Sequence, residues 1–552
     1  MVARPYPVHL VTACHGLWGH PSHIAYIRES LLHHTSRASS SSPGTKVVVL
    51  VPETNAVTFA HTYDGIDTCA DRVVEEIDAE VKRIQDDGGK VTAFSIVGYS
   101  LGGLVARYVL GLLDSRTPSF FDEVRPANFA TFASPAIGVP RYKSFWSSTF
   151  AFLGSRLLSR TGQQLYERDR FLPAKFNPAT RQQQDGDAKG CKGLSKFLSR
   201  RNDAEPLLKL MADPRYSFYR ALSRFERIDV FANTVNDRTV PFPTGGIEAH
   251  DPFALARAKA QKVAQARGDD PDAEVDIRDG GLEITLANNA PIIVSHKQVP
   301  PPALPAGRNP SKRRFRLRLP LLLRPTTYPF SRPVSLLVIA FLPLALPLSV
   351  FYLVGRFALQ TRESRRRIRD ARKRLGGGRE TMLERVGVRL GEVAELAGVD
   401  NPEYAGGLSV EGGEGAQANG GSEASEATHF GPQRTYGSTS GTSTPALARP
   451  VSPPSLSSSR SATPAPSSPS SSSAAHLTPS DEAAKYSTDP VLTSSQLFQI
   501  KNLNAIPQLR KHFVYLPHAR NAHGAIVRRD PSYAAHKAGI KVIDAWAREF
   551  QV

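Results

Sequence analysis

The stretch VTAFSIVGYSLGGLVARYVLGLL, Val91 to Leu113, reads as a buried strand, a sharp turn and a buried helix, in that order. In the turn, Ser100 stands between Gly98 and Gly102. A turn that lifts a serine from a strand end onto a helix start brings backbone segments too close for a Cβ atom, so glycine is favoured on both sides. The stretch therefore predicts Ser100 as a nucleophile at the end of a sheet strand.

The helix expected after Ser100 adds a second feature of a reactive serine. Its first backbone amides have no partner within the helix, and they lie where negative charge would develop on a substrate carbonyl oxygen. The amide of Leu101 is therefore one expected donor to that oxygen. The pentapeptide GYSLG alone is weak evidence, because the same letters can mark a serine that only ends a strand.

Apolar runs and helical patterns alternate around this stretch. The runs VHLVTAC, VVVLVP and NFATFA, at residues 8–14, 47–52 and 128–133, have the composition of buried strands. A helical pattern separates each strand from the next, and this alternation predicts a mainly parallel α/β sheet. The helix expected from Asp71 onward has one apolar stripe, and Asp64 and Asp67 are expected to cap its first turn.

A carboxylate is expected after a later strand. A serine is inert at neutral pH without a base, and in sheet enzymes with this turn the partners follow in the order Ser, Asp, His. The stretch FERIDVFANTVNDRTVPF supplies a strand at 228–232 and then a loop with Asp237. Asp229 lies inside the strand and Asp213 precedes a proline at a helix end, so both are worse placed. Asp237 is the candidate acid, and a solvated loop carboxylate is the alternative.

Three histidines near the C-terminus compete for the role of the base. They lie in HFVYLPHARNAHGAIV, as His512, His518 and His523. His512 is the first residue of the expected strand, so it would lie at the opposite end of the sheet from Ser100. His523 lies in the loop beyond that strand, followed by Gly524 and an apolar pair, and is preferred. His518, directly after Pro517 at the strand end, stays open as the alternative.

The loop after the first strand is the candidate for the second oxyanion donor. In enzymes with this serine turn, that donor comes from a loop after an early strand that commonly begins His-Gly. CHGLWGH follows VHLVTA, which makes Gly16 a motif glycine and the amide of Leu17 the expected donor. The alternative is that His-Gly here is only a turn after a strand.

The positive charge of the chain is concentrated in one segment. The formal net charge is +18, and residues 308–379 hold 18 Lys and Arg against two acids, Glu363 and Asp370. The rest is close to neutral, so no nucleic-acid partner is expected. Within the segment, Val334 to Val354 has 21 residues without a charge, enough for a helix to span a hydrocarbon core of roughly 30 Å. An anionic membrane surface is the expected partner, and a nuclear-localisation patch or a solvated tail is the alternative.

A single crossing by this apolar segment would separate Ser100 and Asp237 from His523 across the membrane. Both flanks are strongly basic, and positive charge prefers the cytoplasmic side. Pro343 and Pro347 lie in the middle and can bend the segment. We therefore expect a membrane hairpin or an interfacial element with both ends cytosolic, at the endoplasmic reticulum or a lipid droplet. A buried pair of core helices is the alternative.

Composition limits the rest of the chain. Residues 406–480 are rich in Gly, Ser and Pro with almost no large apolar side chains, which predicts a disordered linker. Cys14, Cys69 and Cys191 are too few for a disulfide framework and have no metal-ligand spacing, so a reducing compartment and no metal or other cofactor are expected. The N-terminus lacks a secretory pattern, so export is not expected.

With GYSLGG, HGLWG, NDRTVPF and ARNAHGAIV in order, the sequence resembles the fungal putative serine-esterase family of lipase-like α/β-hydrolases, which includes lipid-droplet phospholipases and monoglyceride lipases. TYDGID at 62–67 and SRTGQQL at 159–165 are also similar to the family. The resemblance implies an α/β-hydrolase fold, a triad of Ser100, Asp237 and His523, and cleavage of glycerolipid acyl esters through an acyl-enzyme.

Four parts of the chain are expected. They are the first part of the hydrolase domain at 1–300 with a helical cap at about 141–225, a basic-flanked membrane hairpin at 301–380, a largely disordered linker at 381–495, and the last strand, histidine and helix of the hydrolase domain at 496–552. The apolar stretch SFWSSTFAFLG in the cap favours lipid surfaces over dissolved esters. RQQQDGDAKG at 181–190 looks like an insertion relative to the family.

Two other functions stay open. One is a catalytically silent protein that keeps the fold to bind a lipid surface. The other is a lipid acyltransferase that uses the same triad and passes the acyl group to an alcohol instead of water.

Overall fold

The computed structural model describes residues 5–38, 44–56, 60–170, 205–267, 275–300, 332–375 and 488–552. The chain divides into two compact units, one made of Met1–Ala405 with Leu477–Val552 and the other of Gly406–His476. All the described residues belong to the first unit. The polar stretch at 181–190, and all but the last residues of the linker expected at 381–495, lie outside the described residues.

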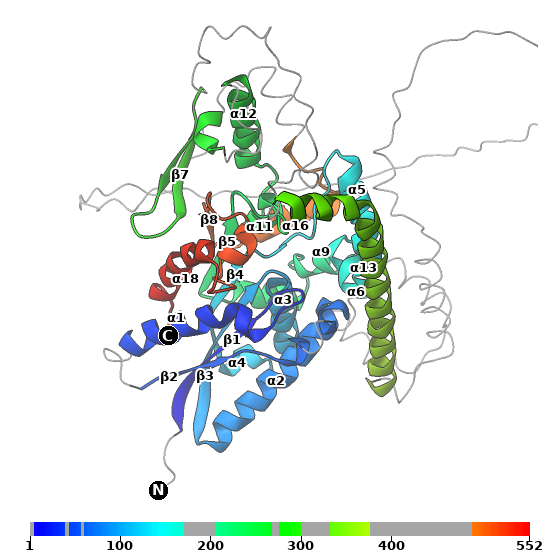
Figure 1. Cartoon of the computed structure of the whole chain (residues 1–552). Coiled ribbons are helices and arrows are strands. Elements are labelled where there is room, and N and C mark those ends of the chain that lie inside the picture. Colours follow the sequence, from blue (N-terminus) through cyan, green and yellow to red (C-terminus); the bar gives the residue numbers. More distant parts are fainter. Residues whose placement is uncertain are drawn as a thin grey trace, which may run out of the picture. The chain divides into compact units, whose positions relative to one another are not determined.

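An eight-stranded sheet in the order β2-β1-β3-β4-β5-β8-β7-β6 forms the centre of this unit (Figure 1). Its strands are β1 (Tyr6–Cys14), β2 (Lys46–Leu50), β3 (Gly89–Tyr99), β4 (Arg125–Phe132), β5 (Arg227–Asn233), β6 (Leu282–Leu286), β7 (Ile292–Gln298) and β8 (Leu509–Val514). From β2 to β8 in this order the pairs are parallel, whereas β7 is antiparallel to β8 and to β6. The mainly parallel sheet and the α/β-hydrolase fold expected from the sequence are confirmed.

Helices cover both faces of the sheet. One face carries α2 (Ile66–Asp86), α3 (Leu101–Asp114) and α10 (Ser217–Ser223), and the other carries α1 (Ala25–Ala38) and α18 (Ala538–Arg548). The other α-helices described are α4 (Phe120–Glu123), α5 (Phe145–Leu157), α6 (Ser159–Leu165), α9 (Leu207–Met211), α11 (Phe242–Gly246), α12 (Pro252–Arg267), α13 (Arg332–Leu375), α16 (Ser494–Asn504) and α17 (Ala522–Ala525). Short 3-10 helices are η1 (Pro21–Ile24), η2 (Thr54–Ala56), η3 (His61–Tyr63), η5 (Ile277–Gly280) and η10 (Ala534–Lys537).

Strand β3 is largely apolar because helices cover both of its faces. Phe94 and Ile96 join the core with α2 and α3, whereas Val97 and Tyr99 join the core with α1 and α18. Each such side chain contributes about 1.5–3 kcal/mol when it leaves water. The nucleophile candidate therefore follows a strand that is held rigidly on both sides.

Helix α2 carries the expected apolar stripe but not the expected cap. It begins at Ile66, and Gly65 is its N-cap without a side-chain hydrogen bond. The expectation that Asp64 caps the first turn is wrong, because its carboxylate is bound instead by Arg72 and Arg367. Asp67 lies within the first turn, where its negative charge interacts favourably with the helix dipole.

The C-terminal part of the chain returns to the middle of the sheet. β8 lies between β5 and β7, with Asn233 opposite Val514. The strand begins at Leu509, before the expected HFVYL, so His512 lies inside it. The central sheet is therefore assembled from strands within residues 6–298 and from β8 at residues 509–514.

The apolar segment between the two parts is a single helix, α13, with Pro343 and Pro347 inside it. The hairpin form of the expected membrane element is therefore wrong, and the interfacial form stays a prediction. Figure 1 shows that α13 changes direction part-way along and does not fold back on itself. Each proline removes a helix hydrogen bond and bends the axis, while the helix continues on either side. Among the described helices, this is the one long and apolar enough, by length and composition, to cross a membrane.

Candidate active site

The loops that follow four parallel strands meet at one edge of the sheet. Cys14 at the end of β1 lies opposite Gly98 near the end of β3, and Asn233 at the end of β5 lies opposite Val514 at the end of β8. Parallel strands present their carboxyl ends at the same edge, where α/β enzymes bind their ligands. The candidate site residues of the sequence come from the loops after these four strands.

Ser100 occupies the turn between β3 and α3 in a strained conformation. Its φ of 56° and ψ of −126° are rare for a residue with a side chain. The turn is held by the amide of Ser100, which donates to the carbonyl of Phe132 at 2.9 Å, and by the amide of Gly103, which donates to the carbonyl of Ser100 at 3.1 Å. This geometry lifts the hydroxyl off the strand end.

The glycines around Ser100 lie where no Cβ atom fits. A Cβ at Gly98 would lie 2.3 Å from the Cα of Gly103, and one at Gly102 would lie 2.2 Å from the carbonyl oxygen of Cys14. A Cβ at Gly16 would lie 2.7 Å from the Cβ of Ser100. The three glycines therefore let the β1 loop, the turn and α3 pack backbone against backbone.

Ser100, His523 and Asp237 form one hydrogen-bonded chain. Nε2 of His523 lies 3.0 Å from Oγ of Ser100, and Nδ1 of His523 lies 3.1 Å from Oδ2 of Asp237. His523 sits in the short helix α17, beyond β8. The arrangement can remove the serine proton and stabilise the imidazolium that forms.

The carboxylate of Asp237 is buried, with a side chain only 2% exposed. Burial alone would raise its pKa, but His523 and hydrogen bonds from Val240 and Asn233 hold that pKa below its ordinary value. Oδ1 accepts from the amides of Thr239 and Val240 at 2.9 and 2.8 Å, and Oδ2 accepts from Nδ2 of Asn233 at 2.8 Å. The group is therefore ionised at neutral pH and fixed in orientation.

The competing residues lie elsewhere. Nε2 of His512 contacts Oδ1 of Asp229 at 2.8 Å, so these two form a pair of their own on β8 and β5. Asp213 forms an ion pair with Arg215 at 2.6 Å. His518 is exposed, and the imidazole nitrogen that meets the hydroxyl of Ser100 belongs to His523.

The two expected oxyanion donors flank the serine. Leu101 opens α3 directly after Ser100, and Leu17 follows Gly16, whose backbone packs against the serine side chain. Within the described residues, neither amide donates a hydrogen bond to another group. Both are therefore free to bind a carbonyl oxygen that lies between them.

Three supporting residues were not predicted from the sequence. The hydroxyl of Tyr99 donates to the carbonyl of His523 at 2.9 Å, and Asn233 donates to Asp237. Nδ2 of Asn236, which has a φ of 60°, donates to the carbonyl of Pro517 at 2.8 Å and ties the acid loop to the histidine loop. Asn is favoured at positive φ, so the Asn-Asp pair after β5 was the available signal for Asn236.

Residues 4–251 match the model of a family described as putative serine esterase (DUF676). The matched residues make up less than half of the chain. The matched region contains Ser100 and Asp237, whereas His523 lies beyond it and reaches the site through β8.

Putative lipases of two fungi are among the curated relatives of this chain. The putative lipase C4A8.10 of Schizosaccharomyces pombe is 26% identical over 290 residues, which are 52% of this chain and 31% of that protein. The putative lipase ROG1 of Saccharomyces cerevisiae is 28% identical over 243 residues, 43% of this chain and 28% of that protein. The match thus spans less than a third of the length of either relative.

Two solved structures resemble this chain distantly. An extracellular alpha/beta-hydrolase from a Paenibacillus species is 14% identical with a TM-score of 0.22, covering 43% of this chain and 82% of its own. Est1E from Butyrivibrio proteoclasticus is 14% identical with a TM-score of 0.22, covering 44% of this chain and 72% of its own.

Proposed function

We propose that this chain is a serine hydrolase that cleaves acyl esters of glycerolipids at a membrane or lipid-droplet surface. The observation that carries the proposal is the hydrogen-bonded chain from Ser100 through His523 to Asp237. A protein kept only to bind lipid would have no need to hold Ser100 in a strained turn within 3.0 Å of a base.

The reaction runs in two halves. Nε2 of His523 takes the proton of Ser100, whose Oγ attacks the ester carbonyl, while the amides of Leu17 and Leu101 stabilise the oxyanion. The intermediate collapses, the bond to the alcohol breaks, and His523 gives its proton to the leaving oxygen. Water then attacks the acyl-enzyme with His523 as base, releasing the fatty acid and restoring Ser100.

Exposed apolar surface supports a lipid substrate. Phe152 and Leu153 on α5 are 47% and 40% exposed, and α5 packs against α13. Between Leu337 and Val354, α13 exposes nearly all of its described apolar side chains. Apolar patches of this extent mark membrane or partner surfaces.

The same helix supports insertion from one side of the membrane. β7 ends at Gln298 within the hydrolase sheet, and the second half of α13 packs against η3, α5 and α6 of the same unit. A full crossing would carry residues 308–332, with eight basic residues and no acids, back through the hydrocarbon core. A bent helix embedded from the cytosolic face avoids this, at the endoplasmic reticulum or at the monolayer of a lipid droplet.

The test is a substrate panel with the full chain. Monoacylglycerol, triacylglycerol and phospholipid are offered as emulsions or vesicles beside a dissolved short-chain acetate ester, with Ser100→Ala as the control. We expect release of fatty acid from at least one lipid at a higher rate than from the acetate ester, and none with Ser100→Ala.

Three outcomes contradict the proposal. Equal rates on dissolved and lipid esters argue against a lipid substrate. Vesicle binding without turnover on any ester identifies a binding protein. Acyl transfer to an added lipid alcohol that exceeds fatty-acid release identifies an acyltransferase.

A further inference from the structure

The two halves of α13 have different surroundings. From Leu337 to Val354 nearly every described side chain is exposed. From position 357 onward, buried or half-buried residues recur at helical spacing: Phe357, Gln360, Thr361, Ser364, Arg367 and Ile368. That spacing marks one face of a helix, so the second half is docked against protein. Most of these side chains are polar, which is why the sequence shows no apolar stripe there.

Three contacts fix the docked half. The ring of Phe357 stacks on Trp18 with centroids 6.0 Å apart, and Oγ1 of Thr361 donates to the carbonyl of Leu157 at 2.7 Å. Further along, Arg367 forms an ion pair with Asp64 at 2.8 Å. The contacts reach the loop after β1, the junction of α5 and α6, and the segment before α2.

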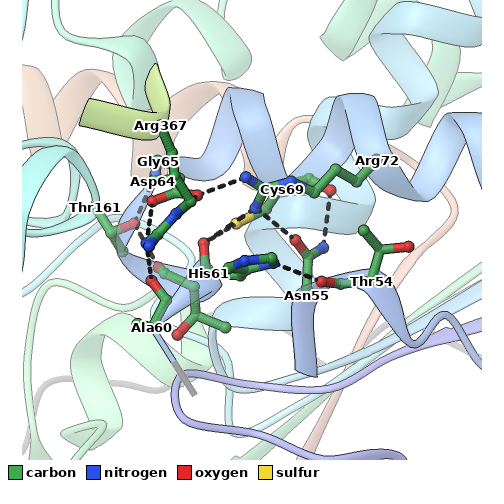
Figure 2. A network of polar contacts seen from close by, with 11 residues as sticks. Thr54, Asn55, Ala60, His61, Asp64, Gly65, Cys69, Arg72, Thr161 and Arg367 are labelled. Carbon is green, nitrogen blue, oxygen red and sulfur yellow. Dashed lines mark hydrogen bonds and ion pairs between the residues drawn. The ribbon is translucent and has the colours of Figure 1, made fainter. Parts of the chain in front are cut away.

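Asp64 is the centre of the polar network in Figure 2. Its carboxylate is fully buried and is bound by Arg72 from α2 and by Arg367 from α13. Arg367 uses both Nε and Nη2 on this carboxylate, and Nη2 also donates to the carbonyl of Ala60 at 3.0 Å. A buried carboxylate needs cationic partners, and α13 provides one of the two that the described residues show.

The motif around Asp64 is interlocked with the second family-like motif. The amide of Gly65 donates to Oγ1 of Thr161 at 3.0 Å, and the amide of Ile66 donates to Oε1 of Gln164 at 2.6 Å. Gly65 has a φ of 106°, which strains any other residue. TYDGID and SRTGQQL therefore form one scaffold, to which the proposed reaction assigns no role.

Trp18 connects this scaffold to the active site. It directly follows Leu17, its amide donates to Oγ1 of Thr62 at 3.3 Å, and its Nε1 donates to the hydroxyl of Tyr63 at 2.7 Å. Its ring also stacks on Phe357 of α13. The residue after the oxyanion amide is thus held between TYDGID and the docked half of α13.

We propose that Trp18, Phe357 and Arg367 are positioning residues that hold the Leu17 amide at the oxyanion. The inference rests on the proposed function and deepens it: the helix that meets the lipid surface also completes the active site. Its docked half is then needed for turnover even when the ester is dissolved and no membrane is present.

The test compares variants at neighbouring positions of α13, each made in the full chain. Their steady-state kinetics are measured on a dissolved p-nitrophenyl ester without lipid. Phe357→Ala and Arg367→Ala are expected to lower kcat about tenfold with KM changed less than twofold, a fraction of the roughly 10²–10³-fold that losing an oxyanion donor costs. Phe357→Tyr keeps the aromatic ring, and its kcat is expected to equal that of the wild type. Leu359→Ala and Arg366→Ala, at exposed positions of the same helix half, leave kcat unchanged.

A spectroscopic measurement separates the inference from the proposed function. Trp18 is one of three tryptophans, and subtracting the spectrum of Trp18→Phe isolates its emission. Phe357→Ala is expected to shift that emission to longer wavelength, whether or not the chain turns over any ester. If Phe357→Ala and Arg367→Ala unfold at the wild-type temperature and keep the wild-type kcat and Trp18 emission, the inference is overturned. Equal losses in Leu359→Ala and Arg366→Ala also overturn it, because a general disturbance of the helix would then explain the effect.

Discussion

Tyr99, the residue before the proposed nucleophile, contacts the proposed base. Its hydroxyl donates to the carbonyl of His523, and its ring lies 5.1 Å from the imidazole. Because α17 is a single short turn, this bond helps to fix His523 relative to β3. In the proposed mechanism, Tyr99 therefore acts through the position of the base.

We expect Tyr99→Phe to lower kcat about fivefold with little change in KM, because one neutral hydrogen bond is worth about 1 kcal/mol. Steady-state kinetics on a dissolved ester measure this. The matched control is Tyr219→Phe, which loses a bond to the carbonyl of Asn502 and lies away from the triad. A kcat for Tyr99→Phe that equals that of the control contradicts the assigned role.

Two buried aspartates with histidine partners allow a comparison at the acid. Asp237 pairs with His523, and Asp229 pairs with His512. We expect Asp237→Asn to lower kcat about 10⁴-fold, because an amide favours the wrong imidazole tautomer. Asp229→Asn is expected to lower the free energy of unfolding and leave kcat intact. The reverse pattern, measured by kinetics and urea unfolding, would make Asp229 the catalytic acid.

Among the elements, the start of α12 carries a carboxyl whose pKa is displaced. Asp251 directly precedes the helix, and its Oδ1 accepts from the amide of Ala254 at 2.8 Å. Burial, together with the nearby Asp489, raises the pKa of Asp251 to about 7. Because the pKa is higher in the folded state, the protonated carboxyl contributes its full stability below the unfolded pKa of 3.8. This contribution to the free energy of unfolding is lost as the pH rises through the folded pKa of about 7.

We therefore expect Asp251→Asn to gain stability relative to wild type as the pH rises. Asparagine keeps the acceptor for Ala254 and carries no charge to bury. Between pH 4 and pH 8 the difference in free energy of unfolding is expected to shift by about 2–4 kcal/mol in favour of the variant. Urea unfolding at both pH values measures it, and a difference that stays constant with pH contradicts the burial of a charged carboxyl.

The elements that could be predicted are those where local rules agree. Residues 91–113 combine an apolar run, flanking glycines and a helical run, and each signal favours the same strand, turn and helix. β6 also had a signal, since LEITL alternates between buried and more exposed side chains, but it was not predicted. The order of serine, acid and histidine along the chain limited the candidates further, and the preference for His523 over His518 rested on loop position alone.

The elements that could not be predicted depend on distant partners. Asp64 looked like a cap because caps are local, whereas its partner Arg367 lies 303 residues further along the chain. The docked face of α13 is mostly polar, so no hydrophobic period reveals it. The prolines suggested a hairpin, but a proline bends a helix as readily as it ends one. These features follow only from the assembled fold.

For the whole molecule, the proposed function requires that both flanks of the apolar helix stay on one side of the membrane. We expect single cysteines placed before residue 332 and after residue 375 to react with a membrane-impermeant maleimide added outside intact microsomes, while a cysteine at Leu344 is protected. Detergent is the control that exposes all three. Protection of one flank alone would indicate a full crossing and would separate Ser100 from His523.

The apolar half of α13 can also be tested by its affinity for lipid. We expect Phe351→Asp, a change at an exposed position, to lose binding to phosphatidylserine-containing vesicles, because a charge in the hydrocarbon region costs about 2.5–3.5 kcal/mol. Vesicle flotation measures the loss. Binding equal to wild type would contradict insertion of this half of α13.

The mechanism depends above all on Ser100 being the nucleophile of an ester hydrolase, and covalent labelling examines this without assuming a substrate. The full chain is treated with a fluorophosphonate, and the modified residue is identified by peptide mass spectrometry. We expect one label, on Oγ of Ser100, that forms much more slowly in His523→Ala and is absent in a folded Ser100→Ala variant. Label on another residue, or none on a folded wild-type chain, would contradict the assignment of Ser100.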